Sequence, residues 1–131
     1  MMRSSTVVIR QQHFPGRAPV DAYGNGGFRF AQMSHRGSLL LLPSGIYGWH
    51  VIEFSALTLA SLAPVFAEQA AIEFLILGTG KRQSFPNLEL RKAFSDHGLG
   101  LEVMDTGSAA RTYNVLLAEK RAVAAALIAV D

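Results

Sequence analysis

Residues 72–80 read IEFLILGTG, a run of aliphatic, β-branched and aromatic side chains that stops at two glycines. The run has the length of a strand, and its nearly continuous apolar character is typical of a central strand with both faces covered. Gly78 and Gly80 then end the strand, because glycine readily turns the chain. We therefore expect the four side chains of residues 74–77 to be almost completely buried.

A helix and a second strand are expected next. Pro86 suits the first turn of a helix, and Leu90 and Phe94 share one helical face. Gly98 stands where a left-handed C-terminal cap falls, and residues 99–104 (LGLEVM) again resemble a strand. A strand–helix–strand passage of this length almost always makes parallel strands through a right-handed crossover.

The C-terminal part of the chain predicts a further helix. Thr106 can cap it, and its apolar stripe consists of Ala109, Tyr113, Leu116 and Leu117. Residues 121–130 are ambiguous, because their apolar side chains would extend the same stripe or form a strand.

The first half of the chain indicates antiparallel strands. Residues 11–27 are rich in Pro and Gly and predict an extended loop, and residues 24–27 (GNGG) suit a tight turn. Residues 28–30 and 38–42 are expected to pair as a hairpin around residues 34–37.

Another strand and a short helix follow. Residues 46–54 alternate as a strand, in which Trp49 is an anchor of the core or of a sheet edge. Apolar residues recur at helical spacing over residues 59–70, and Pro64 requires that this helix begin near Ser61 or bend. The fold class predicted by these patterns is α/β with an added antiparallel layer.

The composition limits the class of protein. With 131 residues, 50% of them hydrophobic and 17% charged, the chain fits one domain with a packed core rather than a disordered chain. The absence of cysteine excludes disulfides, Cys-ligated zinc and thiolate catalysis. Twelve Lys and Arg against ten Asp and Glu give a net charge of +2, and the basic residues are spread along the chain, so we expect no nucleic-acid partner.

The distribution of apolar residues also predicts the location of the protein and its domain boundaries. No run approaches the ~20 apolar residues of a membrane span, and no secretory segment is evident, so we expect a cytoplasmic protein. Residues 1–21, with a short strand at residues 6–9 and the extended loop, are expected to form part of the same domain as residues 22–131.

Familiar catalytic patterns are missing from the sequence. No Gly-x-Ser-x-Gly occurs, and the four histidines are scattered without ligand spacing, so we assign no catalytic residue, metal or cofactor. Gly78 and Gly80 lack the third glycine of a dinucleotide fingerprint, and Leu75 stands where a phosphate-binding loop ending at Lys81 needs glycine.

One constellation remains as a candidate ligand site. Loops after parallel strands open on the same edge of a sheet, where α/β proteins bind ligands. Hydroxyls, cations and a helix N-terminus there suit an anion or another polar ligand. The candidate residues are Gly78, Thr79, Gly80 and Lys81 of one loop and Asp105, Thr106, Ser108 and Arg111 of the other. In the alternative interpretation Thr106 only caps its helix, the glycines only turn the chain, and Arg111 forms a salt bridge.

An ordered set of motifs resembles a known family. The motifs are GGFRF (residues 26–30), GSLLLLPSG (37–45) with Trp49, LILGTG (75–80) and MDTGSAARTYN (104–114). Together they resemble the Mth-like domain family of small uncharacterised proteins, over about residues 22–128. That family includes mitochondrial complex I assembly factor 3 and the adipogenesis-associated Mth-like domain protein.

The resemblance implies a three-layer α/β fold with a mixed central sheet. It also implies that residues 121–130 form a strand antiparallel to its neighbours, in an intracellular protein with no established catalytic activity. Two hypotheses about function stand. The first is a non-catalytic interaction or assembly module that binds another protein, and the second is a binder or enzyme for a small polar or anionic ligand between the Gly78 and Asp105 loops.

Overall fold

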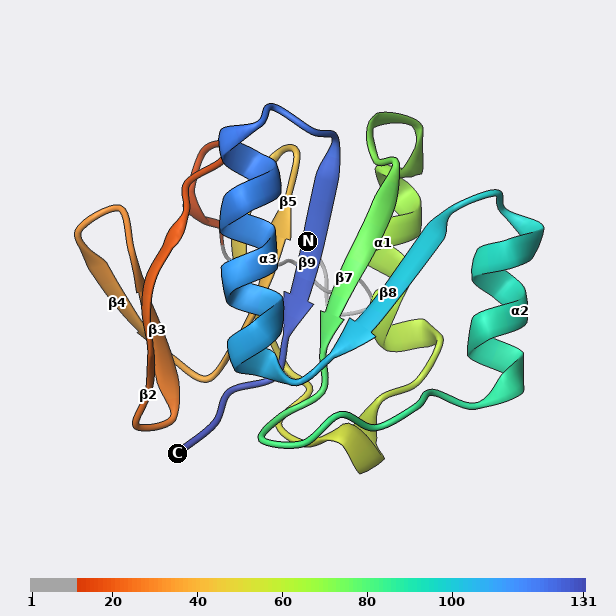
Figure 1. Cartoon of the computed structure of the whole chain (residues 1–131), viewed down its shortest axis with the longest axis horizontal. Helices are drawn as coiled ribbons and strands as arrows, with labels where there is room; N and C mark the ends of the chain where they lie inside the picture. Colours follow the sequence, from red (N-terminus) through yellow and green to blue (C-terminus); the bar gives the residue numbers. More distant parts are fainter. Residues whose placement is uncertain (1–11) are drawn as a thin grey trace, which may run out of the picture.

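The computed structural model describes residues 12–131, and Figure 1 shows its elements. The predicted strand at residues 6–9 lies outside this range. The helices are α1 (Ala63–Ala67), α2 (Leu88–Asp96) and α3 (Thr106–Ala118), with three short 3-10 turns between β6 and β7. The strands are β1 (Gln12–Phe14), β2 (Val20–Gly24), β3 (Gly27–Phe30), β4 (Met33–Arg36), β5 (Ser38–Leu42), β6 (Gly45–Trp49), β7 (Phe74–Gly78), β8 (Gly100–Met104) and β9 (Val123–Leu127).

The strands form two sheets. The large sheet has the order β1-β6-β5-β9-β7-β8, and the small sheet has the order β2-β3-β4. Strand β7 is parallel to both β8 and β9, whereas β5 is antiparallel to both β6 and β9. The large sheet is therefore mixed, and the small sheet is the added antiparallel layer that the sequence predicts.

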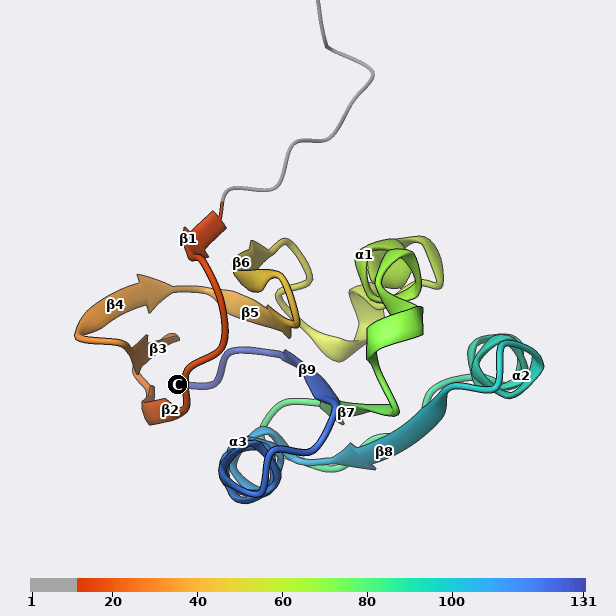
Figure 2. The ribbon, with the colours of Figure 1, turned by 90° about the horizontal axis from the view of Figure 1, so that it is seen from above.

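Two hydrophobic clusters cover the two faces of the large sheet and make a three-layer fold. Successive residues of a strand point to opposite faces. Leu75 and Leu77 pack with the side chains of α1 and α2 in one cluster, whereas Ile76 packs with α3 and the small sheet in the other. Figure 2 shows α1 and α3 on opposite sides of the strands. Leu75, Ile76 and Leu77 have no exposed surface, which confirms β7 as a central strand.

Four expectations need correction. The first concerns the predicted hairpin of residues 28–30 with 38–42. Strand β3 instead pairs with β4, because Ala31 and Gln32 both have positive φ and form a two-residue turn. Ala-Gln is not a usual pair for such a turn, so the residue types there do not indicate one. The predicted turn at residues 34–37 is largely strand β4, and β5 belongs to the other sheet.

The other three corrections concern single elements. The expected loop at residues 11–27 contains the whole of β1 and β2, although its tight turn is present at Asn25 and Gly26, which both have positive φ. Strand β9 is antiparallel only to β5 and is parallel to β7, because α3 carries the chain back along the sheet before β9 begins. Phe74 is only partly buried, because it begins β7 at the rim, where the Arg121 guanidinium lies over its ring.

Other predicted features are present. Trp49 is buried and its indole donates a hydrogen bond to the Ser61 carbonyl, so it is a core anchor. Pro64 lies in the first turn of α1. Gly98 follows α2 with a φ of 66°. Among residues 12–131 no helix is long and apolar enough to cross a membrane.

Candidate functional site

The carboxyl ends of three parallel strands meet at one edge of the large sheet. Gly78, at the end of β7, pairs with Met104 of β8 and with Leu127 of β9. The two loops of the predicted cleft therefore do leave the sheet side by side. A Cβ placed at Gly78 would lie 3.1 Å from the Thr106 Cα, so glycine allows α3 to begin this close to β7.

Thr106 joins three segments of the chain at this edge. Its fully buried hydroxyl donates a hydrogen bond to the Ile128 carbonyl at 2.7 Å and accepts one from the Gly80 N–H at 2.9 Å. The Thr106 N–H also donates to the Gly80 carbonyl. Thr106 is thus the first residue of α3 and a buried link, and its hydroxyl already has both a donor and an acceptor as partners.

Thr79 closes the first loop in a similar way. Its hydroxyl donates to the Arg82 carbonyl at 2.6 Å and accepts from the Ser84 N–H at 3.0 Å. The side chain is buried, at 4% exposure. The two threonine hydroxyls of the predicted site consequently bind the protein's own main chain.

Asp105 caps α3, in place of Thr106. Its carboxylate accepts hydrogen bonds from the N–H and the hydroxyl of Ser108, at 2.9 and 2.8 Å. The pKa of Asp105 is lowered, first by the Ser108 N–H, then by the Ser108 hydroxyl, and further by the nearby charge of Arg111. The N-terminus of α3 therefore already holds a negative charge that belongs to the protein.

The cations of the predicted site are exposed. The Arg111 guanidinium contacts the Tyr23 hydroxyl at 3.3 Å and the Ser108 hydroxyl at 3.5 Å. Between Arg111 and Asp105 the described chain contains no ion pair. Arg111 also borders an open hollow of about 470 Å3 between β2 and α3, where both amide atoms of Asn114 hydrogen-bond the backbone of Val20 at 2.8 Å. Lys81 is exposed on its loop.

The structure thus divides the predicted residues into two groups. Gly78, Thr79, Gly80 and Thr106 form a largely buried hydrogen-bonded link, while Asp105, Ser108 and Arg111 form a partly open cluster at the start of α3. Lys81 belongs to neither group. Within residues 12–131 no group of three or more His, Asp or Glu side chains is arranged to hold a metal ion.

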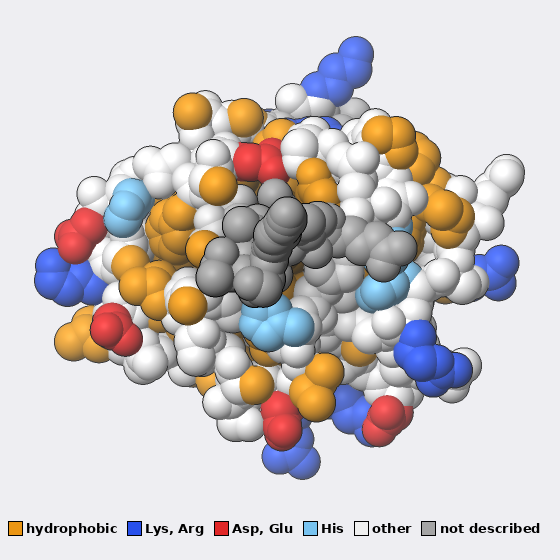
Figure 3. All heavy atoms as spheres, turned by 180° about the vertical axis from the view of Figure 1, so that it is seen from behind, with side chains coloured by type: hydrophobic (Ala, Val, Ile, Leu, Met, Phe, Trp, Pro, Cys, Tyr) orange, Lys and Arg blue, Asp and Glu red, His pale blue; other side chains and the backbone are white. Residues whose placement is uncertain are grey.

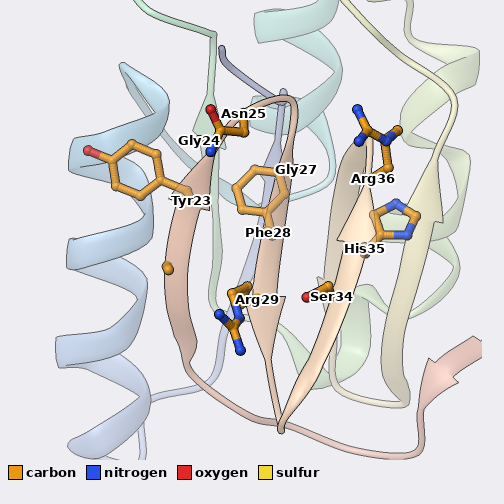
Figure 4. Close-up of a pocket in the computed structure, with 10 residues that line it drawn as sticks. Tyr23, Gly24, Asn25, Gly27, Phe28, Arg29, Ser34, His35 and Arg36 are labelled. Carbon is orange, nitrogen blue, oxygen red and sulfur yellow. The ribbon is translucent and has the colours of Figure 1, made fainter.

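A second hollow, which the sequence did not indicate, lies on the small sheet (Figure 4). It measures about 410 Å3, and Arg29 and Arg36 line it together with backbone-rich positions of β2 and β3. The sequence predicts a turn at residues 34–37, so it does not indicate that Arg36 lies on a strand, on the same sheet face as Arg29. The alternation of FRF in residues 28–30 is the available signal that Arg29 points away from the core.

A third hollow, of about 380 Å3, lies between β6 and α1 beside Trp49. Figure 3 shows the molecule from behind, with hydrophobic side chains, charges and histidines interspersed on that face.

The comparisons with known proteins agree with the fold. A family profile described as "Protein of unknown function (DUF498/DUF598)" matches residues 20–128. A Danio rerio protein named NADH dehydrogenase [ubiquinone] 1 alpha subcomplex assembly factor 3 is 33% identical over 126 residues, which cover 96% of this chain and 72% of that protein.

Solved structures give the same result. A crystal structure described as an outer membrane protein from Bartonella henselae is 52% identical, covers 91% of this chain and 100% of its own, and has a TM-score of 0.87. A solution structure of a Bordetella pertussis protein, described as a Mth938-like domain, is 30% identical, covers 86% of this chain and 85% of its own, and has a TM-score of 0.74. The chain therefore belongs to the DUF498/DUF598 family, whose Mth938-like fold it shares.

Proposed function

We propose that this protein is a non-catalytic interaction module of the assembly-factor type, which binds a partner protein while a larger complex is put together. The name of the Danio rerio relative supports this role. The observation that carries the proposal is the bonding at the carboxyl edge of the sheet. The Thr79 and Thr106 hydroxyls, which are candidate groups of the predicted ligand site, are buried and bound to main-chain groups. A cytoplasmic location and the absence of a nucleic-acid partner remain predictions from the sequence.

The experiment for this proposal measures assembly of NADH dehydrogenase in cells that lack the protein. We expect blue-native electrophoresis to reveal less assembled complex while the subunit transcripts stay at their normal level. Restoring the wild-type gene should restore the complex. An unchanged amount of complex in the deleted strain would contradict an assembly role in this enzyme.

A second candidate function is binding of a small anionic or polar ligand between the Gly78 and Asp105 loops. The exposed cations Lys81 and Arg111, and the hollow beside Arg111, favour it. A ligand at ~100 times its dissociation constant adds about 2.7 kcal/mol of stability. Millimolar phosphate should then raise the melting temperature of the wild type but not of Arg111→Ala, and Arg111→Lys should recover part of the rise.

The control for phosphate binding is Arg91→Ala, which removes the same charge from an exposed position on α2. Equal responses of the wild type, Arg111→Ala and Arg91→Ala would mean that phosphate acts without this site.

A further inference from the structure

The outer face of the small sheet carries a hollow without a bulky floor. Phe28 and Phe30 of β3 are buried in the cluster that also contains α3, so the intervening Arg29 points to the opposite face. The hollow on this face has a volume of about 410 Å3. Ala22, Gly24 and Gly27 contribute almost no side chain to this hollow, so it lies beside the arginines over small residues of β2 and β3 (Figure 4).

Two arginines border this hollow, and neither has a partner among residues 12–131. Arg29 of β3 and Arg36 of β4 are both exposed, and over residues 12–131 neither side chain makes a hydrogen bond or an ion pair. The residues that line the hollow include no Asp or Glu. An ideal Cβ at Gly26 would lie 3.8 Å from Arg36 Nη1, so this guanidinium lies over the turn between β2 and β3. Within the described chain neither guanidinium therefore has an ion-pair partner that would offset its charge.

The strand register sets the distance between the two arginines. Arg29 is paired with Ser34, and Arg36 is paired with Gly27, so the arginines are diagonal neighbours on one face. Diagonal neighbours on antiparallel strands are roughly 7–8 Å apart, and their Cβ atoms are somewhat closer. In an extended peptide, residues i and i+2 point to the same side and are separated by about 6.6–6.8 Å. This spacing suits two carboxylates on alternate residues, each of which binds its own guanidinium.

We propose that the outer face of the small sheet binds an extended acidic segment of a partner protein, with Asp or Glu at alternate positions over Arg29 and Arg36. This inference rests on the proposed function, since it names the chemistry of the partner that the interaction module binds. A single phosphate is a poorer match. Hydrogen-bond donors to one small anion lie close together, whereas Arg29 and Arg36 are diagonal neighbours on two strands.

The hollow is held in shape before anything binds. The Gly26 N–H donates to the Val130 carbonyl at 2.8 Å, and the Gly26 carbonyl accepts from the Gly37 N–H at 2.7 Å. A Cβ at Gly27 would collide with the His35 carbonyl oxygen, so β3 and β4 approach closely only because this residue is glycine. A preformed surface loses little conformational entropy on binding, which favours affinity.

The test is fluorescence anisotropy on the purified full chain with two labelled peptides of equal charge. One peptide has two acids at alternate positions (Ser-Glu-Ser-Glu-Ser), and the other has the same composition with its two acids adjacent (Ser-Glu-Glu-Ser-Ser), so that no pair of acids lies at positions i and i+2. We expect the alternating peptide to bind more tightly. Arg29→Gln and Arg36→Gln should each weaken it about three- to tenfold, and added salt should weaken it further. Arg91→Gln, with the same charge change on α2, should bind like the wild type.

Three outcomes would overturn the inference. The first is equal affinity for the two peptides. The second is equal affinity of Arg29→Gln, Arg36→Gln and Arg91→Gln for the alternating peptide. The third is Arg29- and Arg36-dependent binding of inorganic phosphate, or of phosphatidylserine vesicles, without binding of either peptide. Arg29→Lys and Arg36→Lys, which keep the charge, should lose less affinity than the glutamine variants.

The peptide test is independent of the assembly experiment. Normal assembly of NADH dehydrogenase together with selective peptide binding would contradict the proposed function alone. A defect in assembly without selective peptide binding would overturn the present inference alone.

Discussion

At the scale of single residues, the hydroxyl of Thr106 is the link that most directly holds the carboxyl edge together. Thr106→Val leaves the Gly80 N–H and the Ile128 carbonyl without these partners, and each unsatisfied buried group costs about 1–3 kcal/mol. We expect a loss of about 2–4 kcal/mol in the free energy of unfolding, measured with urea. Thr106→Ser keeps the hydroxyl and should lose only about 1 kcal/mol.

Thr112→Val is the matched control for that substitution, since Thr112 lies on the same helix and its hydroxyl makes no hydrogen bond within residues 12–131. Equal stabilities of Thr106→Val and Thr112→Val would show that the buried link contributes nothing. The sequence pattern correctly predicts Thr106 at the start of α3 but assigns it the cap that Asp105 forms. Both side chains can cap a helix, and only the position of the first helical turn separates them.

His35 makes stability depend on pH. Burial, and then the charge of nearby His13, lower its pKa from the ordinary 6.5, and the two rings lie 4.6 Å apart between centroids. The unfolded chain therefore binds a proton more readily than the folded chain, so folding stability falls as the pH drops from 6.5 through the lower folded pKa. We expect His35→Gln to flatten this part of the stability profile, measured by urea unfolding at a series of pH values.

The control for His35 is His50→Gln, a change at an exposed histidine. It should leave the acid-side slope as it is in the wild type. A profile for His35→Gln as steep as that of the wild type would mean that other groups cause the loss of stability in acid.

At the scale of elements, Asn114 attaches the small sheet to α3. Its side-chain amide accepts from the Val20 N–H and donates to the Val20 carbonyl, both at 2.8 Å. Asn114→Ala removes both bonds and should cost about 1–3 kcal/mol. Hydrogen exchange should show that the Val20 amide loses protection. The amides of β7 should still exchange only through global unfolding.

Val115→Ala, a truncation at the next position on α3 where the side chain is 57% exposed, should leave exchange at Val20 unchanged. Protection of Val20 that is the same in Asn114→Ala and the wild type would contradict the attachment.

The elements were predictable to different degrees in the two halves of the chain. The second half has a nearly continuous apolar strand in β7, a glycine cap at Gly98 and a proline before α2, and these local signals agree with one another. In the first half the decisive turn is Ala31-Gln32, whose residue types rarely adopt positive φ. If that turn is not recognised, the sequence predicts a loop instead of a strand at Ser34, His35 and Arg36.

The candidate site was predictable only in its location. Parallel pairing of β7 with β8 follows from a general rule about crossovers, so the two loops had to share an edge. Whether Thr79 and Thr106 face a ligand or the protein's own main chain depends on the path of residues 80–84 and on Ile128, which local patterns do not specify. The Arg29–Arg36 pair likewise depends on the register of β3 with β4.

At the scale of the whole molecule, β7 couples the two hydrophobic clusters. Leu75 points into the cluster that contains Trp49, and Ile76 points into the cluster beneath α3 and the small sheet. Both side chains are fully buried, so Leu75→Ala and Ile76→Ala should each lower the free energy of unfolding by about 2–5 kcal/mol. Because one strand belongs to both clusters, the two layers should unfold together as a two-state system.

The single tryptophan makes this coupling measurable, since Trp49 reports on one cluster only. In urea, Trp49 fluorescence and far-ultraviolet circular dichroism should give the same midpoint for each variant. Ile76→Ala should therefore shift the Trp49 transition as far as Leu75→Ala does for an equal loss of stability, although its side chain lies on the other face. In one outcome, Ile76→Ala would lower the circular dichroism midpoint but leave the Trp49 midpoint at the wild-type value. That outcome would mean that the layers unfold independently.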